Sequence, residues 1–375
     1  MEELRRALDV MYTDPDPLHK AQANKWLYEH QRSMDAWNTS NQLLLSSTPV
    51  PTYVEFFAAQ TLQTKIRYDF HELPKDSWNA LRDSILNHLR VRCTTLGEKS
   101  IRTQLCLAVT ALAIQMETWE NIISDLITEL GLDALGGKCL LEILTVLPEE
   151  CLDAHYSSLS DERQKKMETE CRKNGKRILE ILVTLMQCAS VPKRQMEMQN
   201  MVFRCLQSWI YCCKLSAHDV ASNAVVQSLF QAIQDPCLFD AAVDAAVSLF
   251  RMYDTIATDM VLIQSIVPHV MTLQPLFQQA VENSDTDTCV GLARIFSEMA
   301  ESYTELIIGP HEMNQGQIME LLLRCMVYPE HDVTVITIQF WYRYTDGLRQ
   351  LPDDVKRARV TQHVPFLNQL ATTCT

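Results

Sequence analysis

Residues 35–38 read DAWN, residues 76–79 read DSWN and residues 117–120 read ETWE, so an acidic residue and a tryptophan recur twice at an interval of 41 residues. An acidic side chain favours the start of a helix, where backbone N–H groups are unpaired, and the tryptophan can open the apolar side of that helix. A repeat of about 40 residues that holds two helices is typical of HEAT and armadillo arrays. Because a single helical hairpin leaves one face uncovered, such units must stack in series. The three copies therefore predict an α-solenoid.

The rest of the sequence extends this pattern. Apolar residues recur three and four positions apart, as at Ile101, Leu105, Val109 and Leu112, which is the period of a one-sided helix. Most prolines fall between such stretches, where helices start or stop. We predict an all-α fold, a right-handed superhelix of about eight to nine antiparallel HEAT pairs. The predicted pairs are 2–12 with 17–31, 33–46 with 51–70, 77–92 with 99–115, 118–130 with 136–147, 161–188 with 194–214, 218–234 with 237–256, 259–282 with 286–308, and 315–328 with 331–349, before a last helix from Asp353.

The composition excludes several other classes of protein. The 375 residues include 9 glycines, and 47% of them are hydrophobic. So few glycines disfavour hairpin-rich β folds and phosphate-binding loops, and the hydrophobic content excludes a disordered chain. No apolar run reaches the ~18 residues of a membrane span, and the start lacks the apolar core of a signal peptide. We expect a soluble chain without a membrane partner.

Charge and reactive residues argue for protein partners and against catalysis. The net charge of −14 opposes direct binding to nucleic acid. It suits a partner with a basic surface, although an acidic surface that serves solubility alone explains it equally well. The ten histidines lack metal-ligand spacing and no catalytic motif is present, so we expect no enzyme, no metal and no cofactor.

The cysteines and one basic stretch raise separate questions. The 13 cysteines include no C-x-x-C pair, and we expect them to be reduced and mostly buried. A basic stretch stands out in the acidic chain, and it is either a solvated helix face or a contact with an acidic partner or with another part of the chain. It contains Arg163, Lys165, Lys166, Arg172, Lys173, Lys176 and Arg177.

Motifs near the start carry a resemblance to a known family. Residues 23–27 fit A-x-x-W-L, residues 31–37 read QRSMDAW, and residues 54–66 read VEFFAAQTLQTKI. This order is similar to the N-terminal signature of the importin-β (karyopherin) superfamily.

Later blocks refine the resemblance. LLEILTVLPEE at 140–150, VFRCLQSW at 202–209 and FWYR at 340–343 resemble the transportin-3 branch of that superfamily, with the importin-13 branch more distant. The resemblance thus covers most of the chain.

The resemblance implies a function and a set of partners. Members of the family are nuclear transport receptors that bind GTP-bound Ran through the inner helices of their first repeats. They pass the pore on Phe-Gly nucleoporins and shuttle between cytoplasm and nucleus. The transportin-3 branch implies SR-type splicing factors as cargo. The alternative from the repeats alone is a HEAT-repeat scaffold or adaptor subunit of another class.

The resemblance also implies a division of the chain. We expect residues 1–375 to form one solenoid, with Ran-binding repeats in 1–115 and repeats similar to those of exportin-1 and importin-β in 116–375. No closing repeat follows the last helix, so we expect the array to be truncated before the C-terminal half that reads the cargo.

Candidate Ran contacts follow from helix geometry together with the resemblance. In the helix predicted at 51–70, apolar side chains face the stack and polar ones face away from it, with Lys65 at the signature lysine of the family. The first pair offers comparable positions. The candidates are Lys25, Tyr28, Gln31, Gln60, Thr64, Lys65 and Arg67.

Overall fold

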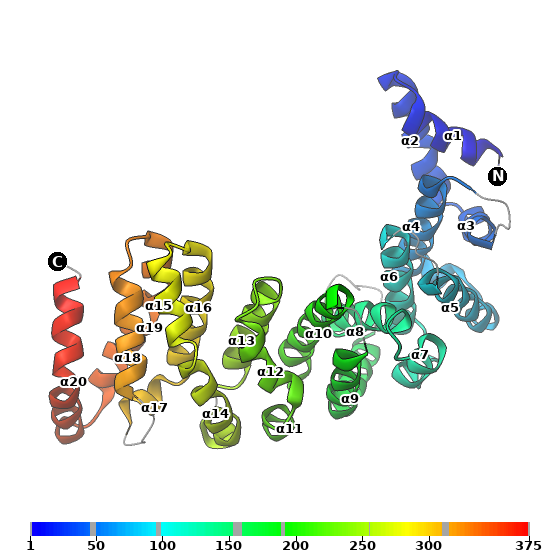
Figure 1. Cartoon of the computed structure of the whole chain (residues 1–375). Helices are drawn as coiled ribbons and strands as arrows, with labels where there is room; N and C mark the ends of the chain where they lie inside the picture. Colours follow the sequence, from blue (N-terminus) through cyan, green and yellow to red (C-terminus); the bar gives the residue numbers. More distant parts are fainter. Residues whose placement is uncertain are drawn as a thin grey trace. The chain divides into compact units, whose positions relative to one another are not determined.

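The computed structural model describes residues 2–45, 50–94, 99–152, 160–188, 192–254, 256–309 and 315–373. Within these ranges the chain forms α-helices and two short 3-10 helices, without strands (Figure 1). The predicted all-α fold of stacked HEAT-type helix pairs is confirmed.

The element bounds follow the predicted pairs closely. The first elements are α1 (Glu2–Thr13), α2 (Pro17–Gln31), α3 (Asp35–Leu45), α4 (Thr52–Asp69), η1 (Phe70–Glu72), η2 (Lys75–Ser77), α5 (Trp78–Thr94), α6 (Lys99–Gln115), α7 (Ile122–Leu130) and α8 (Gly136–Leu152). They continue with α9 (Asp161–Gln187), α10 (Pro192–Cys213), α11 (Ala217–Ala221), α12 (Ala224–Ala232), α13 (Phe239–Met252) and α14 (Ile256–Met271). The last are α15 (Gln274–Glu282), α16 (Thr286–Ser302), α17 (Thr304–Ile308), α18 (Gln315–Val327), α19 (His331–Gln350) and α20 (Asp353–Thr373).

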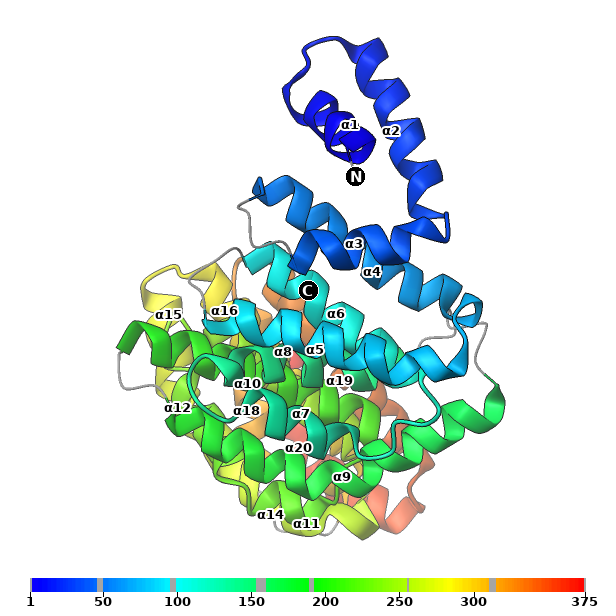
Figure 2. The same cartoon turned by 90° about the vertical axis from the view of Figure 1, so that its right-hand side faces the viewer.

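The chain divides into two compact units. The first comprises Met1–Asn174 with Gln187–Arg194, and the second comprises Gly175–Met186 with Gln195–Thr375. In the first unit α4 packs on α6 and α6 on α8, while α3 and α5 cover this row from one side (Figure 2). In the second unit α13, α16 and α19 pack in a row, covered by α12, α15 and α18. Each unit is therefore a two-layered stack of helices.

The recurring tryptophans mark equivalent places in the first unit. Trp37 lies in the first turn of α3, Trp78 begins α5, and Trp119 precedes α7; all three are buried. Each indole N–H has a partner, because Trp37 donates to Glu72 Oε2 at 3.2 Å, Trp78 to the carbonyl of Leu73 at 3.3 Å, and Trp119 to Asp125 Oδ2 at 2.9 Å. Burial of a large ring with its polar atom satisfied anchors the start of one covering helix per repeat.

Three predicted helices of the second unit are split in the structure. One of them, 286–308, divides at Tyr303 into α16 and α17. The other two break at capping residues. The predicted helix 218–234 breaks between α11 and α12, where the side chain of Asn223 accepts a hydrogen bond from the backbone N–H of Val225 and caps a new helix. The predicted helix 259–282 breaks between α14 and α15, and Pro275 stands at the start of α15. The breaks before α12 and α15 use residues that favour helix starts, Asn at the cap and Pro in the first turn.

The expectation that no apolar stretch reaches the length of a membrane span needs a correction at one place. Met260–Glu282 is long and apolar enough for a membrane span by length and composition. The structure breaks it into α14 and α15, and its apolar side chains Ile263, Ile266 and Phe277 are buried. About 39% of the apolar window is buried, which is the pattern of helices that pack one side against the stack.

The cysteines also depart from expectation at one place. The ends of α5 and α8 bring the Cα atoms of Cys93 and Cys139 to 6.9 Å, and their sulfurs form a disulfide. The prediction of reduced thiols is therefore wrong for this pair. The sequence did not reveal the pair, because two positions 46 residues apart meet only through repeat stacking. Elsewhere in the described ranges the cysteines carry thiols, most of them buried.

Arg163 resolves part of the question about the basic stretch. Its guanidinium is buried and donates to the backbone carbonyls of Ala113 at 2.8 Å, Ile114 at 2.9 Å and Met116 at 3.0 Å. These carbonyls end α6, where the helix leaves acceptors unpaired and favours a positive charge. Arg163 is thus an internal cap, while the six other cations of the stretch are exposed.

A buried histidine couples the stability of the first unit to pH. His88 on α5 is 2% exposed, its Nε2 lies 2.8 Å from Asn41 Oδ1 on α3, and the Ser84 hydroxyl donates to the same oxygen at 2.7 Å. Burial lowers the pKa of His88 to about 4. The unfolded chain, with a histidine pKa of about 6.5, binds the extra proton first as the pH falls. We expect full stability above about pH 6.5 and a loss of about 2 kcal/mol from this group at pH 5.

The measurement is the free energy of unfolding in urea at pH 7 and at pH 5, for the wild type and for His88→Gln. The variant should be less stable at pH 7 and should lose less stability than the wild type between the two pH values. The exposed His71 supplies the control His71→Gln, which should keep the wild-type pH dependence. An unchanged pH dependence in His88→Gln would contradict the assignment.

Candidate partner interface on the first helix pairs

The predicted interface lies on α2 and α4 in the first unit. The two helices meet where Gln31, at the end of α2, donates its amide N–H to Thr61 Oγ1 on α4 at 3.1 Å. This hydrogen bond bridges two positions 30 residues apart and ties the first helix pair to the second. Gln31 is half-buried as a result, so its side chain serves the fold and is partly withdrawn from a partner.

The exposed side of α2 combines charge with an aromatic ring. Lys25 is exposed, and its Nζ lies 4.0 Å from Glu29 Oε1. Tyr28 is 58% exposed. Arg32 donates to the Tyr28 hydroxyl at 3.1 Å and places its guanidinium 5.6 Å from the centre of that ring. Tyrosine and arginine are the residues that most often carry binding energy at protein interfaces.

A second exposed strip runs along α4. Gln60 is exposed, Thr64 is half-buried one turn later, and Tyr68 is 59% exposed one further turn along. Spacing by four residues places these side chains on one face of the helix. Tyr68 was not among the candidates predicted from the sequence, although its spacing from Gln60 and Thr64 could have identified it.

Lys65 lies elsewhere than the sequence predicted. Its side chain is 1% exposed, with Nζ 3.0 Å from Asp69 Oδ2 and 2.6 Å from Glu72 Oε2. The ammonium also lies 5.4 Å from the centre of the Trp37 ring. The lysine therefore faces inward, and its expected place on the outer side of the helix is wrong.

The short helix η1 explains this orientation. It turns the chain back after α4 and brings Glu72 over the end of that helix, where Glu72 accepts hydrogen bonds from Lys65 and from Trp37. The hydrogen bond from Lys65 lowers the pKa of Glu72 below its ordinary value, and the one from Trp37 adds to this. A buried ammonium is tolerated only with such partners, so Lys65 is a structural residue of this repeat.

Arg67 is also engaged within the fold. Its Nη1 donates to Glu150 Oε1 on α8 at 3.0 Å, and each side chain of the pair is 18% exposed. Its backbone carbonyl accepts from the Gln115 amide on α6 at 3.0 Å. Arg67 thus links α4 to the two following helices of the row.

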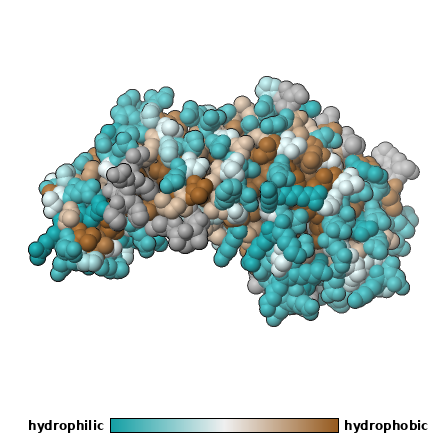
Figure 3. Space-filling view, turned by 90° about the horizontal axis from the view of Figure 1, so that it is seen from below, coloured by the Kyte–Doolittle hydropathy of each residue, from teal (hydrophilic) through white to brown (hydrophobic). Residues whose placement is uncertain are grey.

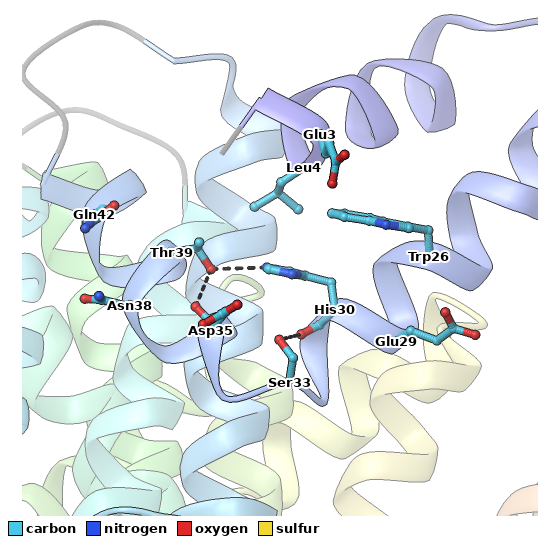
Figure 4. Close-up of a pocket in the computed structure, with 10 residues that line it drawn as sticks. All are labelled: Glu3, Leu4, Trp26, Glu29, His30, Ser33, Asp35, Asn38, Thr39 and Gln42. Atoms are coloured by element: carbon cyan, nitrogen blue, oxygen red, sulfur yellow. Dashed lines mark hydrogen bonds between the residues drawn. The ribbon is translucent and has the colours of Figure 1, made fainter.

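A separate cleft opens between α1, α2 and α3 (Figure 4). It has a volume of about 430 Å³, and the rings of Trp26 and His30 stack in it with their centres 5.2 Å apart. His30 Nε2 lies 3.1 Å from Thr39 Oγ1, and burial lowers the pKa of this histidine. The lining includes three carboxylates and no lysine or arginine, so the cleft could accept a cationic group. This cleft could not be predicted from the sequence, because its walls come from three helices.

The described residues offer no group of histidine, cysteine, aspartate and glutamate side chains that could hold a metal ion. Hydrophilic side chains dominate the face seen in Figure 3, and apolar ones gather in smaller patches between them. The exposed polar and aromatic side chains of α2 and α4 are of the kinds that contact a macromolecular partner.

Three family models match successive parts of the chain. The importin-beta N-terminal domain matches residues 23–91, the exportin 1-like protein family matches 98–245, and the transportin-3/importin-13 second TPR domain matches 284–373. The first of these matches contains both exposed helix faces described above.

Curated proteins are similar to the chain along nearly its whole length. Importin-13 of Bos taurus is 29% identical over 97% of this chain and 38% of its own length. Transportin MOS14 of Arabidopsis thaliana is 28% identical over 90% of this chain and 35% of its own length. A Schizosaccharomyces pombe protein is 31% identical over 82% of this chain and 32% of its own length. The chain thus spans about 38% of the length of the importin-13 proteins that it matches.

The buried position of Lys65 leads to a test by substitution. Lys65→Met keeps the apolar stem but leaves Asp69 and Glu72 without their shared cation. Because both carboxylates retain some contact with water, we expect the free energy of unfolding to fall by about 2–3 kcal/mol. The control Lys25→Met removes an exposed cation and should change it by less than about 0.5 kcal/mol.

Urea unfolding of both variants, followed by tryptophan fluorescence, measures these differences. Equal stabilities of Lys65→Met and Lys25→Met would show that Lys65 does not support the fold.

Proposed function

The chain belongs to the importin-β superfamily, near the transportin-3 and importin-13 members, and from this premise we propose that it is a nuclear transport receptor. It binds Ran in its GTP-bound form through the exposed faces of α2 and α4. The observation that carries the proposal is the importin-beta N-terminal domain match at residues 23–91, which contains both faces. Membership of this superfamily argues against a HEAT scaffold of another class.

The proposed Ran contacts that are accessible in the structure form two short strips. Lys25 and Tyr28 project from α2, and Gln60, Thr64 and Tyr68 project from α4. Two exposed tyrosines provide rigid aromatic area at low entropic cost, and the polar side chains between them supply hydrogen bonds. Lys65 and Arg67 act indirectly, since their internal ion pairs hold α4 in place.

The mechanism is an exchange of partners without catalysis. Ran and cargo each lower the affinity of the receptor for the other, and this coupling must be reciprocal in free energy. We propose SR-type splicing factors as the cargo, with supporting resemblance in the blocks at 202–209 and 340–343. On this proposal the protein shuttles between cytoplasm and nucleus through the pore.

A groove in the second unit suits the Phe-Gly repeats of nucleoporins. It has a volume of about 410 Å³ and lies between the C-terminal half of α9 and the junction of α11 with α12. Leu179 and Val183 of α9 and Ala224 of α12 give it an apolar floor, and Lys176, Glu180 and Asp219 stand around it. A shallow apolar groove with a polar rim fits weak, repeated contacts with single phenylalanine side chains.

Ran binding is tested by substitutions on the two strips. The variants Lys25→Glu with Tyr28→Ala, and Gln60→Glu with Thr64→Glu, should each weaken binding to GTP-bound Ran at least tenfold. Removal of a tyrosine anchor, or addition of unpaired charge, acts directly on the contact. Lys20→Glu, about 140° away from Lys25 around α2, is the control and should bind like the wild type.

Isothermal titration with Ran loaded with GTP or with GDP gives the affinities. Equal affinity of the wild type for the two forms would refute Ran-dependent transport. A wild type that prefers GTP-bound Ran, with both variants unchanged, would refute the chosen faces.

Nucleoporin binding is tested in the groove of the second unit. Val183→Glu places a charge on its apolar floor and should weaken binding of a Phe-Gly repeat peptide several-fold, because the phenylalanine would have to pack against a carboxylate. Thr184→Glu adds the same charge at the next, exposed position and serves as the control. Equal binding of the peptide by both variants, measured by fluorescence anisotropy, would place the nucleoporin contact elsewhere.

A further inference from the structure

The cleft between α1, α2 and α3 is not used by the proposed Ran contacts. It lies within the first unit, and its volume of about 430 Å³ falls at the low end of the ~300–1,000 Å³ that ligand pockets occupy. Each helix contributes one carboxylate to the lining, Glu3 from α1, Glu29 from α2 and Asp35 from α3, and the lining holds no lysine or arginine. The charge of the cleft therefore suits one cationic group.

Two stacked aromatic rings form part of its wall. Trp26 and His30 lie one turn apart on α2, their ring planes are within 2° of parallel, and their centres are 5.2 Å apart. Both side chains are half-buried, and Figure 4 shows the rings between Glu3 and Leu4 of α1 and Asp35 of α3. The face of a tryptophan ring attracts a cation through its quadrupole. The wall thus adds an aromatic contact to the charge of the carboxylates.

A chain of two hydrogen bonds holds the imidazole of His30 in place. The Thr39 hydroxyl donates to the backbone carbonyl of Asp35 at 2.8 Å, so its oxygen accepts from the Nε2–H of His30 at 3.1 Å. Burial lowers the pKa of His30 below its ordinary value, and the ring is therefore uncharged at pH 7. A fixed, uncharged ring supports the stack with Trp26 without repelling a cation.

The three carboxylates differ in how far they are engaged within the fold. Glu29 Oε1 lies 4.0 Å from the Nζ of Lys25, a residue of the proposed Ran contact, so its charge is partly shared. Glu3 and Asp35 are exposed and lie on either side of the two rings (Figure 4). In the ranges that the structure describes, no group of such side chains could hold a metal ion. The arrangement favours a ligand whose charge is spread over several N–H donors.

We propose that this cleft binds one arginine side chain of a partner protein. A guanidinium is planar, stacks on aromatic faces and offers five N–H donors to carboxylates, whereas the ammonium of lysine is a compact and strongly hydrated charge. The guanidinium lies against the ring of Trp26 and donates to Glu3 or Asp35. Trp26 is about 160° away from Tyr28 around α2, so the site is separate from the proposed Ran contact and does not depend on it.

The binding test uses the full chain and blocked pentapeptides with two alanines on each side of a central arginine, lysine or citrulline. Citrulline keeps the shape of arginine and lacks its charge. The indole N–H signal of Trp26, identified by its loss in Trp26→Phe, reports binding at the cleft in NMR titrations. We expect a saturable shift with the arginine peptide, at least threefold weaker binding of the lysine peptide, and no saturable shift with the citrulline peptide.

Paired substitutions test the carboxylates. Glu3→Gln with Asp35→Asn should weaken binding of the arginine peptide at least fivefold, because two charges are removed while the shapes are kept. Glu3→Gln alone leaves the start of α3 intact and should weaken it about twofold or more. The control Asp76→Asn with Glu120→Gln removes the same charge at exposed sites in the two following tryptophan motifs, and it should bind within twofold of the wild type. Circular dichroism should show the same helix content in both double variants.

Several results would overturn the proposal. They are no saturable shift with the arginine peptide, equal binding of the arginine and citrulline peptides, or equal affinities in the two double variants. Equal binding of the arginine and lysine peptides would assign the cleft to cations in general and would refute its selectivity for a guanidinium.

Discussion

A helical hairpin in this chain cannot bury its apolar side alone. This constraint determines how the helices pack, where the polar side chains find partners and which faces stay exposed. The apolar side of a hairpin is buried only when the next hairpin packs on it, so helices of one row must approach closely. Gly291 on α16 shows how closely, because a Cβ at this position would lie 2.5 Å from the ring of Phe239 on α13. The side chains between neighbouring helices of a row must therefore fit residues one repeat away, and the polar ones must find their partners there.

Polar and titratable residues accordingly divide into two kinds. Lys65, His88 and Arg163 are buried, and each is held by groups from another element, such as Glu72, Asn41 or the carbonyls that end α6. Removing one partner of such a contact leaves the other unpaired in a poorly solvated place. These residues join one repeat to the next, and the proposed function assigns recognition to the helix faces that stacking leaves open.

The sequence predicted the helices, which depend on local patterns, and missed the contacts between residues that only repeat stacking brings together. The helices follow from a 3.6-residue period and from proline positions, and their predicted bounds agree with the structure within a few residues for most pairs. The inward turn of Lys65 depends on Glu72, which η1 folds back over α4, and no periodicity encodes that turn. The Cys93–Cys139 disulfide and the Arg163 cap likewise join positions about 46 to 50 residues apart. For the proposed interface, the pattern named Lys25, Tyr28 and Gln60, which are exposed, but it could not separate these from residues engaged within the fold.

This separation matters for how binding experiments on a solenoid are interpreted. Substitution of Lys65 or Arg67 removes an internal ion pair, so a loss of binding at those positions reports on the shape of the repeat. Substitution of Tyr28 or Gln60 leaves the packing between rows intact, and a loss there reports on the contact itself. Each helix of a row offers only a narrow open strip, so high affinity requires several strips at once. A partner that spans several strips is then sensitive to the packing between repeats, which allows one bound protein to change the affinity for another without any catalytic group.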